Sequence, residues 1–162
     1  MTYQYKKKIF EFFWLIPKKI AGSNLPQTNG AIQELKNEGI TSVISLARSE
    51  LVSDLLVNSG IKHEVIEFDD FSIPSEKQLF EIINYLKNLN ENEKILVHCQ
   101  LGLGRTGVLL ALYLMINENL SAKQAIEKVR NVRPGAIQSY EQENFLLDIN
   151  INEEFRKKIK ND

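Results

Sequence analysis

Two kinds of apolar spacing alternate along this chain. Short apolar or alternating runs predict strands, and these runs fall at residues 9–16, 43–46, 61–68 and 94–98. Apolar residues that recur every three or four positions predict helices, at residues 29–38, 50–58, 75–86, 106–117, 121–130 and 140–158. Strands that alternate with helices predict an α/β fold, with a mostly parallel central sheet flanked by helices on both faces.

Three of the predicted helices begin with the same local signal. A serine is followed three residues later by a glutamine at Ser75 and Gln78, at Ser121 and Gln124, and at Ser139 and Gln142. In a capping box of this kind, each side chain accepts a hydrogen bond from the backbone N–H of the other residue. The three boxes therefore predict where these helices start.

Length and charge narrow the class of protein. At 162 residues the chain is expected to form one domain, spanning residues 1–162, with a substantial core. Its 20 Lys and Arg balance 21 Asp and Glu, so no nucleic-acid partner is expected from bulk charge. The basic clusters at residues 6–8 and 156–160 are interpreted as solvated charge near the termini.

The apolar run at residues 9–16 follows three lysines and superficially resembles a signal peptide. Glu11 interrupts this run, Pro17 follows it, and no small-residue cleavage site lies at the usual distance. No other apolar stretch approaches the roughly 20 residues that a membrane helix needs. We therefore expect a cytoplasmic protein with no membrane partner.

Cys99 is the only cysteine, and His63 and His98 are the only histidines. One cysteine excludes an internal disulfide, and three such side chains are too few for a tetrahedral zinc site. We expect neither a metal nor another cofactor. Cys99 is then either a small buried apolar residue or a reactive thiol.

A loop with two glycines joins the strand that ends at His98 to the helix that begins near Thr106. Gly102 and Gly104 are expected to allow the positive φ angles of a concave loop. Backbone N–H groups in such a loop point inward, and the helix N-terminus adds a positive dipole, so the loop can bind a phosphate group. The phosphate-binding backbone is expected to come from Gln100, Leu101, Gly102, Leu103 and Gly104.

The side chains around this loop fit nucleophilic chemistry. The inward N–H groups and the helix dipole would stabilise the thiolate of Cys99. Arg105 can hold two phosphate oxygens with its planar guanidinium, and Thr106 can donate its hydroxyl to the Cys99 sulfur. His98 is expected to orient the loop rather than act as a base. The alternative is a purely structural role, with a buried cysteine beside a helix-capping arginine, and it leaves the two glycines and Thr106 unexplained.

The order of His98 and Cys99, five residues, then Arg105 and Thr106 resembles the signature of the cysteine-based protein tyrosine phosphatases. Residues 133–142 (RPGAIQSYEQ) look like the segment that follows this signature in compact archaeal tyrosine phosphatases and in small VHZ-type atypical dual-specificity phosphatases. Residues 16–23 are similar to the first strand pair of those proteins. The resemblance covers most of residues 14–149 and implies a dual-specificity-phosphatase-like fold.

The resemblance also implies a general acid on a loop after the third predicted strand. The family's acid commonly follows a proline and precedes an apolar residue, which favours Asp70, ahead of Phe71. Asp69 stands where that proline is common, so the choice between the two aspartates stays open. In the implied reaction Cys99 attacks the phosphate and forms cysteinyl-phosphate, while Asp70 protonates the leaving group and then activates water.

Several other polar residues keep two interpretations. Gln142 either positions the hydrolytic water, as a glutamine does in some relatives, or belongs only to its capping box. Arg133 either contacts phosphate or fixes the turn at residues 134–135. Arg130 is expected to be a solvated helix end, and His63 is expected to be structural.

The implied function is hydrolysis of phosphate monoesters on phosphorylated proteins or peptides by a monomeric phosphatase. Phosphotyrosine is favoured, and the shallow pocket of short family members also admits phosphoserine and phosphothreonine. A phosphoinositide phosphatase often has lysine in the signature loop, and this loop has none. An RNA 5'-phosphate phosphatase favours a His-Gly pair and an asparagine in the loop, and this loop has neither. A phosphopeptide-binding pseudophosphatase would typically lose Cys99, Arg105 or the acid, and all three are present.

Overall fold

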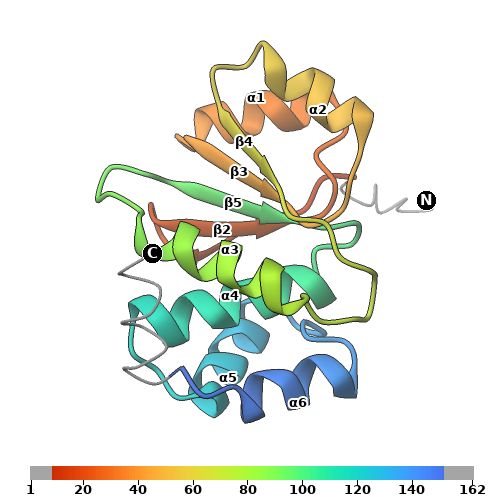
Figure 1. Cartoon of the computed structure of the whole chain (residues 1–162). Coiled ribbons are helices and arrows are strands. Elements are labelled where there is room, and N and C mark those ends of the chain that lie inside the picture. Colours follow the sequence, from red (N-terminus) through yellow and green to blue (C-terminus); the bar gives the residue numbers. More distant parts are fainter. Residues whose placement is uncertain (1–8, 152–162) are drawn as a thin grey trace, which may run out of the picture.

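The computed structural model describes residues 9–151, which build a five-stranded sheet in the order β1-β2-β5-β3-β4 (Figure 1). The strands are β1 (Phe12–Ile16), β2 (Ile20–Ser23), β3 (Ser42–Ser45), β4 (Lys62–Val65) and β5 (Ile95–His98). β1 and β2 form an antiparallel pair, whereas β2 with β5, β5 with β3 and β3 with β4 are parallel. The predicted mostly parallel sheet is therefore confirmed, and so is the strand pair expected at residues 16–23.

Helices cover both faces of this sheet, as predicted (Figure 1). They are α1 (Asn29–Asn37), α2 (Glu50–Val57), α3 (Glu76–Lys87), α4 (Gly104–Asn117), α5 (Ala122–Val132) and α6 (Tyr140–Asp148). The first two lie on one face, and α3 and α4 lie on the other, with α5 and α6 packed against α4. Each face has its own cluster of buried apolar side chains.

α4 is the central helix of the molecule. Every residue from Gly104 to Met115 is buried, because α4 contacts β2 and β5 on one side and α3, α5 and α6 on others. A helix surrounded in this way has no solvated face, which accounts for its continuous apolar sequence. This packing fixes the N-terminus of α4 beside the carboxyl end of β5.

The three predicted capping boxes are confirmed at α3, α5 and α6. In each box the serine hydroxyl accepts a hydrogen bond from the glutamine N–H, and the glutamine side chain accepts one from the serine N–H. Local sequence therefore determines these helix starts.

Three predicted elements are too long by more than one residue. β1 begins at Phe12 rather than residue 9. β4 ends at Val65 rather than residue 68, although Ile66 still donates a backbone hydrogen bond to Ser45, the last residue of β3, and Phe68 donates one to Leu46. α6 ends at Asp148, because the backbone of Ile149 is extended. The side chains of Ile149 and Ile151 both pack against the core. Residues 152–158 of the predicted last helix lie outside the described residues, as do the basic clusters at residues 6–8 and 156–160.

No helix within residues 9–151 combines the length and the apolar character needed to cross a membrane.

Hydrogen bonds connect the side chains of Ser45, His98 and the partly buried His63 across three neighbouring strands. The parallel pairing of β3 and β5 places Ser45 opposite His98. The Ser45 hydroxyl lies 2.5 Å from Nε2 of His98 and 2.7 Å from Nε2 of His63, and Nδ1 of His98 lies 3.1 Å from the carbonyl oxygen of Cys99. His98 is fully buried, and this burial lowers its pKa to about 4. The imidazole therefore stays neutral while it orients the backbone at Cys99.

The lowered pKa of His98 predicts a specific loss of stability in acid. The unfolded chain takes up a proton on this ring near pH 6.5, whereas the folded protein does so only near pH 4. The free energy of unfolding should therefore fall as pH decreases between these values, by up to about 1.4 kcal/mol per pH unit from His98. Urea midpoints across this range should show a shallower slope for His98→Gln, and equal slopes in both proteins would refute the assignment.

Candidate active site

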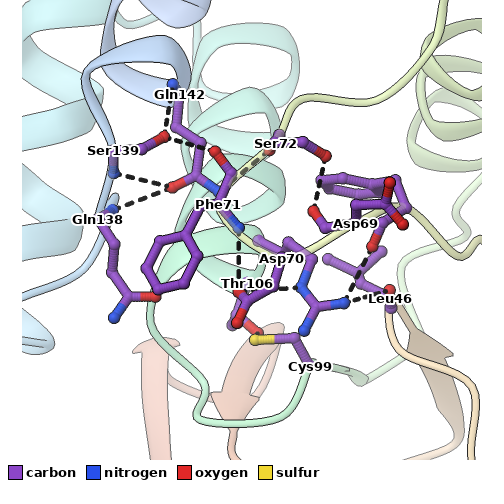
Figure 2. Close-up of polar contacts among 12 residues, drawn as sticks. Leu46, Asp69, Asp70, Phe71, Ser72, Cys99, Thr106, Gln138, Ser139 and Gln142 are labelled. Atoms are coloured by element: carbon purple, nitrogen blue, oxygen red, sulfur yellow. Dashed lines mark hydrogen bonds and ion pairs between the residues drawn. The ribbon is translucent and has the colours of Figure 1, made fainter.

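Cys99 follows β5 directly, and its thiol is 2% exposed at the N-terminal end of α4. The hydroxyl of Thr106 donates a hydrogen bond to the sulfur at 3.0 Å (Figure 2). The N–H of Gly102 donates another at 3.3 Å. Both hydrogen bonds would stabilise negative charge that develops on the sulfur during a reaction. The structure thus places Thr106 against Cys99 as the sequence predicted.

The two glycines of the signature loop (residues 99–105) have different reasons to be glycine. Gly102 has a φ of 72°, as predicted, and a Cβ there would lie 2.5 Å from the backbone of Ser23. The prediction of a positive φ at Gly104 is wrong, because Gly104 is already the first residue of α4. A Cβ at Gly104 would instead lie 2.8 Å from Oε1 of Gln138 and 3.0 Å from Oε1 of Gln142.

α4 begins two residues earlier than the sequence predicted, so Arg105 and Thr106 both belong to its first turn. No side chain caps this helix at its N-cap residue, Leu103. Uncapped N–H groups and the positive end of the helix dipole therefore lie next to the Cys99 sulfur. This arrangement suits an anion such as a phosphate group.

Arg105 is the buried cation of the site. Its Nη1 donates to the carbonyl oxygen of Phe68 at 2.9 Å and to that of Leu46 at 3.4 Å, the segments that follow β4 and β3 (Figure 2). Its Nε is buried and has no hydrogen-bond partner among residues 9–151. A buried donor without a partner is costly, so this guanidinium is well suited to bind the oxygens of a phosphate group.

The two candidate acids lie differently in the Asp70 loop (residues 68–72). Oδ1 of Asp70 lies 3.6 Å from Nε of Arg105, and Asp70 is about half exposed. The carbonyl oxygen of Asp69 accepts hydrogen bonds from the N–H and hydroxyl of Ser72, which turns the chain. The geometry therefore favours Asp70 as the carboxyl group that can reach a bound phosphate ester.

Gln142 is fully buried, and its amide is engaged on both sides. Oε1 accepts from the N–H groups of Gln138 at 3.0 Å and Ser139 at 3.3 Å, and Nε2 donates to the carbonyl oxygen of Ser72 at 3.1 Å (Figure 2). The capping interpretation is thus confirmed, and the contact with Ser72 adds a link to the Asp70 loop. The water-positioning role stays a prediction.

Arg133 makes contacts that differ from both interpretations of the sequence, which were phosphate binding and support of the turn at residues 134–135. Its guanidinium donates to the carbonyl oxygens of Leu101 at 3.0 Å and Gly102 at 3.2 Å, and it forms an ion pair with Glu11 at 2.7 Å. Arg133 therefore holds the outer side of the signature loop. No sequence pattern indicates this contact, because the partners are backbone carbonyls about 30 residues away along the chain.

The prediction that Arg130 is a solvated helix end is wrong. Its guanidinium donates to the carbonyl oxygens of Ala136 and Ile137, both at 3.0 Å, and pairs with Glu143 at 2.9 Å. Arg130 thereby fixes the segment between α5 and α6. A charged residue in a last helical turn looks the same in sequence whether it faces solvent or folds back over the next loop.

Apolar side chains remain exposed on the loops around Cys99. Phe71 of the Asp70 loop is 52% exposed, Leu101 of the signature loop is 54% exposed, and Tyr140 at the start of α6 is 85% exposed.

Within residues 9–151 there is no group of three or more His, Cys, Asp or Glu side chains placed to hold a metal ion.

Comparison with known proteins agrees with this geometry. A family model described as "Swiss Army Knife protein, DSP-PTPase phosphatase domain" matches residues 10–146. The chain is 28% identical over 140 residues to the dual specificity protein phosphatase CDC14B of Mus musculus, which covers 78% of this chain and 28% of that protein. It is 29% identical over 142 residues to CDC14A of Homo sapiens, covering 78% of this chain and 23% of that protein. The chain thus spans about a quarter of the length of these relatives.

Two solved structures share the fold. Tk-PTP in its active form has a TM-score of 0.73 and 29% identity, covering 83% of this chain and 92% of that chain. Kinase associated phosphatase, with serine in place of its catalytic-site cysteine, has a TM-score of 0.73 and 27% identity, covering 93% and 95%. Since the family model covers most of the chain, including the loop at Cys99, this chain belongs to the cysteine-based protein tyrosine phosphatase superfamily, within the DSP-PTPase phosphatase domain family.

Proposed function

We propose that this domain hydrolyses phosphate monoesters on proteins through a cysteinyl-phosphate intermediate. One observation carries the proposal: the buried sulfur of Cys99 accepts hydrogen bonds from Thr106 and Gly102 beside a guanidinium whose Nε has no hydrogen-bond partner within residues 9–151. A nucleophile and a cation fixed next to an uncapped helix N-terminus provide both parts of a phosphoryl-transfer site.

In the first step, the Cys99 thiolate attacks phosphorus while the signature loop and Arg105 bind the phosphate oxygens. The S–P bond forms as the P–O bond to the leaving group breaks. Asp70 gives its proton to the departing oxygen, which would otherwise leave as a poorly stabilised anion. Because the transition state of such transfers is loose, positioning and charge stabilisation supply most of the catalysis.

In the second step, water attacks the cysteinyl-phosphate and Asp70 takes a proton from it. The O–P bond forms, the S–P bond breaks, and inorganic phosphate leaves with the Cys99 thiolate restored. Thr106 stabilises the sulfur as both attacking and leaving group. Gln142, next to the Asp70 loop, would position the water if its amide exchanged its present partners.

Protein substrates are favoured by the relatives and by the site. CDC14B and CDC14A carry the name of dual specificity protein phosphatases. The exposed Phe71, Leu101 and Tyr140 offer apolar contacts to a peptide and to an aromatic ring. We therefore infer action on phosphotyrosine, and also on phosphoserine and phosphothreonine, by a monomer in the cytoplasm.

Phosphoinositide hydrolysis is the second candidate. PTPMT1, solved in complex with PI(5)P, has a TM-score of 0.73 and 20% identity, which shows a shared fold alone. The side chains of Gln100, Leu101 and Leu103 carry no positive charge for additional phosphates. An RNA 5'-phosphate substrate and a pseudophosphatase are disfavoured by the loop sequence and by the presence of Cys99, Arg105 and Asp70.

Replacing the nucleophile should abolish turnover. Cys99→Ser is expected to reduce kcat on p-nitrophenyl phosphate by at least about a thousandfold, because a hydroxyl ionises far less readily than a thiol. The variant should still bind a phosphotyrosine peptide, since the loop N–H groups and Arg105 remain. Near-normal turnover in the folded variant would refute the role of Cys99.

The two adjacent aspartates provide a matched pair for the acid. Asp70→Asn is expected to reduce kcat/KM by about 100-fold or more for phenyl phosphate, and less for p-nitrophenyl phosphate, whose leaving group needs no proton. Asp69→Asn, the control, should have an effect of less than about threefold, because the Asp69 backbone forms the turn. The opposite result would shift the acid by one position.

A substrate panel tests the class of ester. We expect kcat/KM for phosphotyrosine peptides to exceed that for phosphoserine and phosphothreonine peptides, because phenolate is the better leaving group. The peptides should also exceed phosphoinositide vesicles at mildly acidic and at neutral pH. Dominant release of phosphate from the inositol lipids would overturn the substrate class and leave the mechanism intact.

A further inference from the structure

The capping box of α6 has a contact that is absent from the equivalent box of α5. In both boxes the serine hydroxyl accepts a hydrogen bond from the glutamine N–H. The hydroxyl of Ser139 also donates to the carbonyl oxygen of Phe71 at 2.7 Å (Figure 2). Within residues 9–151, the hydroxyl of Ser121 has only its bond to Gln124. The contact of Ser139 spans 68 positions of sequence, and helix capping does not require it.

The Asp70 loop is held by its backbone from two sides. Arg105 donates to the carbonyl oxygen of Phe68 at 2.9 Å at the start of the loop. Ser139 and Gln142 donate to the carbonyl oxygens of Phe71 and Ser72 at its end. The position of the carboxyl group therefore depends on where these backbone contacts hold the chain.

Phe71 has a conformation that needs such support. Its φ is 60°, in the left-handed region that a bulky residue rarely adopts. A residue in this region persists only where surrounding contacts outweigh the strain. Oδ1 of Asp70 accepts a hydrogen bond from the N–H of Phe71 at 3.0 Å, so a change at Phe71 moves the carboxyl group directly.

We propose that Ser139 is a positioning residue whose hydroxyl, by holding the Phe71 carbonyl, keeps the carboxyl group of Asp70 beside Arg105. This inference rests on the proposed function, in which Asp70 is the general acid. Ser139 acts through Phe71 and does not touch the reacting atoms. Its loss should impair proton donation to the leaving group and leave binding of the phosphate group unchanged.

The expected signature is a dependence on the leaving group. Ser139→Ala should lower kcat/KM about tenfold for phenyl phosphate, because one hydrogen bond controls the fraction of molecules with Asp70 in place. For p-nitrophenyl phosphate the decrease should be less than about threefold, since its leaving group needs little protonation. The inhibition constant of inorganic phosphate should stay the same.

Four further variants separate positioning from helix capping. Ser121→Ala is the matched control, because it removes the same cap from α5 without touching the Asp70 loop. Ser139→Asp retains a capping oxygen but has no donor at neutral pH, so it should behave like Ser139→Ala and remain folded if the alanine variant does not. Ser139→Thr retains the donor and should restore activity toward phenyl phosphate. Adding Ser139→Ala to Asp70→Asn should cause no further loss.

The outcomes are distinguishable. Leaving-group dependence in Ser139→Ala and Ser139→Asp, with neither Ser121→Ala nor Ser139→Thr showing it, supports the proposal. If Asp70→Asn shows this dependence and the Ser139 variants do not, the positioning role fails and the proposed function stands. If Asp70→Asn shows no dependence, the acid assignment fails and the positioning role fails with it.

Discussion

A positive charge is buried where the sheet, α4 and the Asp70 loop meet, and the architecture of the site depends on it. The guanidinium of Arg105 receives partial compensation from the carbonyl oxygens of Leu46 and Phe68 and from Asp70 at 3.6 Å. Burying a cation is costly unless it is paired, so these contacts fix the ends of two strands around it. Nε of Arg105 has no hydrogen-bond partner within residues 9–151 and can donate a hydrogen bond to a phosphate oxygen, which makes anion binding favourable at this position.

Guanidinium groups and hydroxyls that donate to backbone carbonyls hold the loops around this charge. Arg133 supports the signature loop from outside, Arg130 supports the segment before α6, and Ser139 supports the Asp70 loop. The helices that carry or flank these three side chains, α5 and α6, both pack against the buried helix α4. Its burial on several sides leaves the N-terminus of α4 little freedom to move. The site thus combines a Cys99 thiol next to a buried helix with an Asp70 loop held by a few long-range hydrogen bonds.

The parts of this site that the sequence predicts are those encoded locally. The three capping boxes and the Thr106 contact with Cys99 involve residues within seven positions of one another, so spacing alone indicates them. Spacing cannot distinguish a glycine required for φ from one required for space, which is why Gly104 was interpreted wrongly. The contacts of Arg130 and Arg133 with later or earlier loops depend on tertiary packing that no periodicity reports. The end of α6 also depends on tertiary packing. Ile149 has extended backbone, yet its side chain packs against the core, so its apolar character does not indicate that the helix continues.

Phosphate binding and substrate choice are carried by different chemistry in this domain. In the proposed function, backbone N–H groups and Arg105 bind the phosphate, and such contacts would treat every monoester alike. The exposed side chains of Phe71, Leu101 and Tyr140 are aromatic or apolar and come from three separate segments, the Asp70 loop, the signature loop and the start of α6. In the proposed reaction an aromatic ester gains twice, because its ring can pack against these side chains and its phenolate leaves more readily than an alkoxide. A lipid headgroup would gain from neither effect, and the signature loop has no additional cation for it. The proposed preference for phosphotyrosine over a polyphosphorylated inositol rests on these two differences.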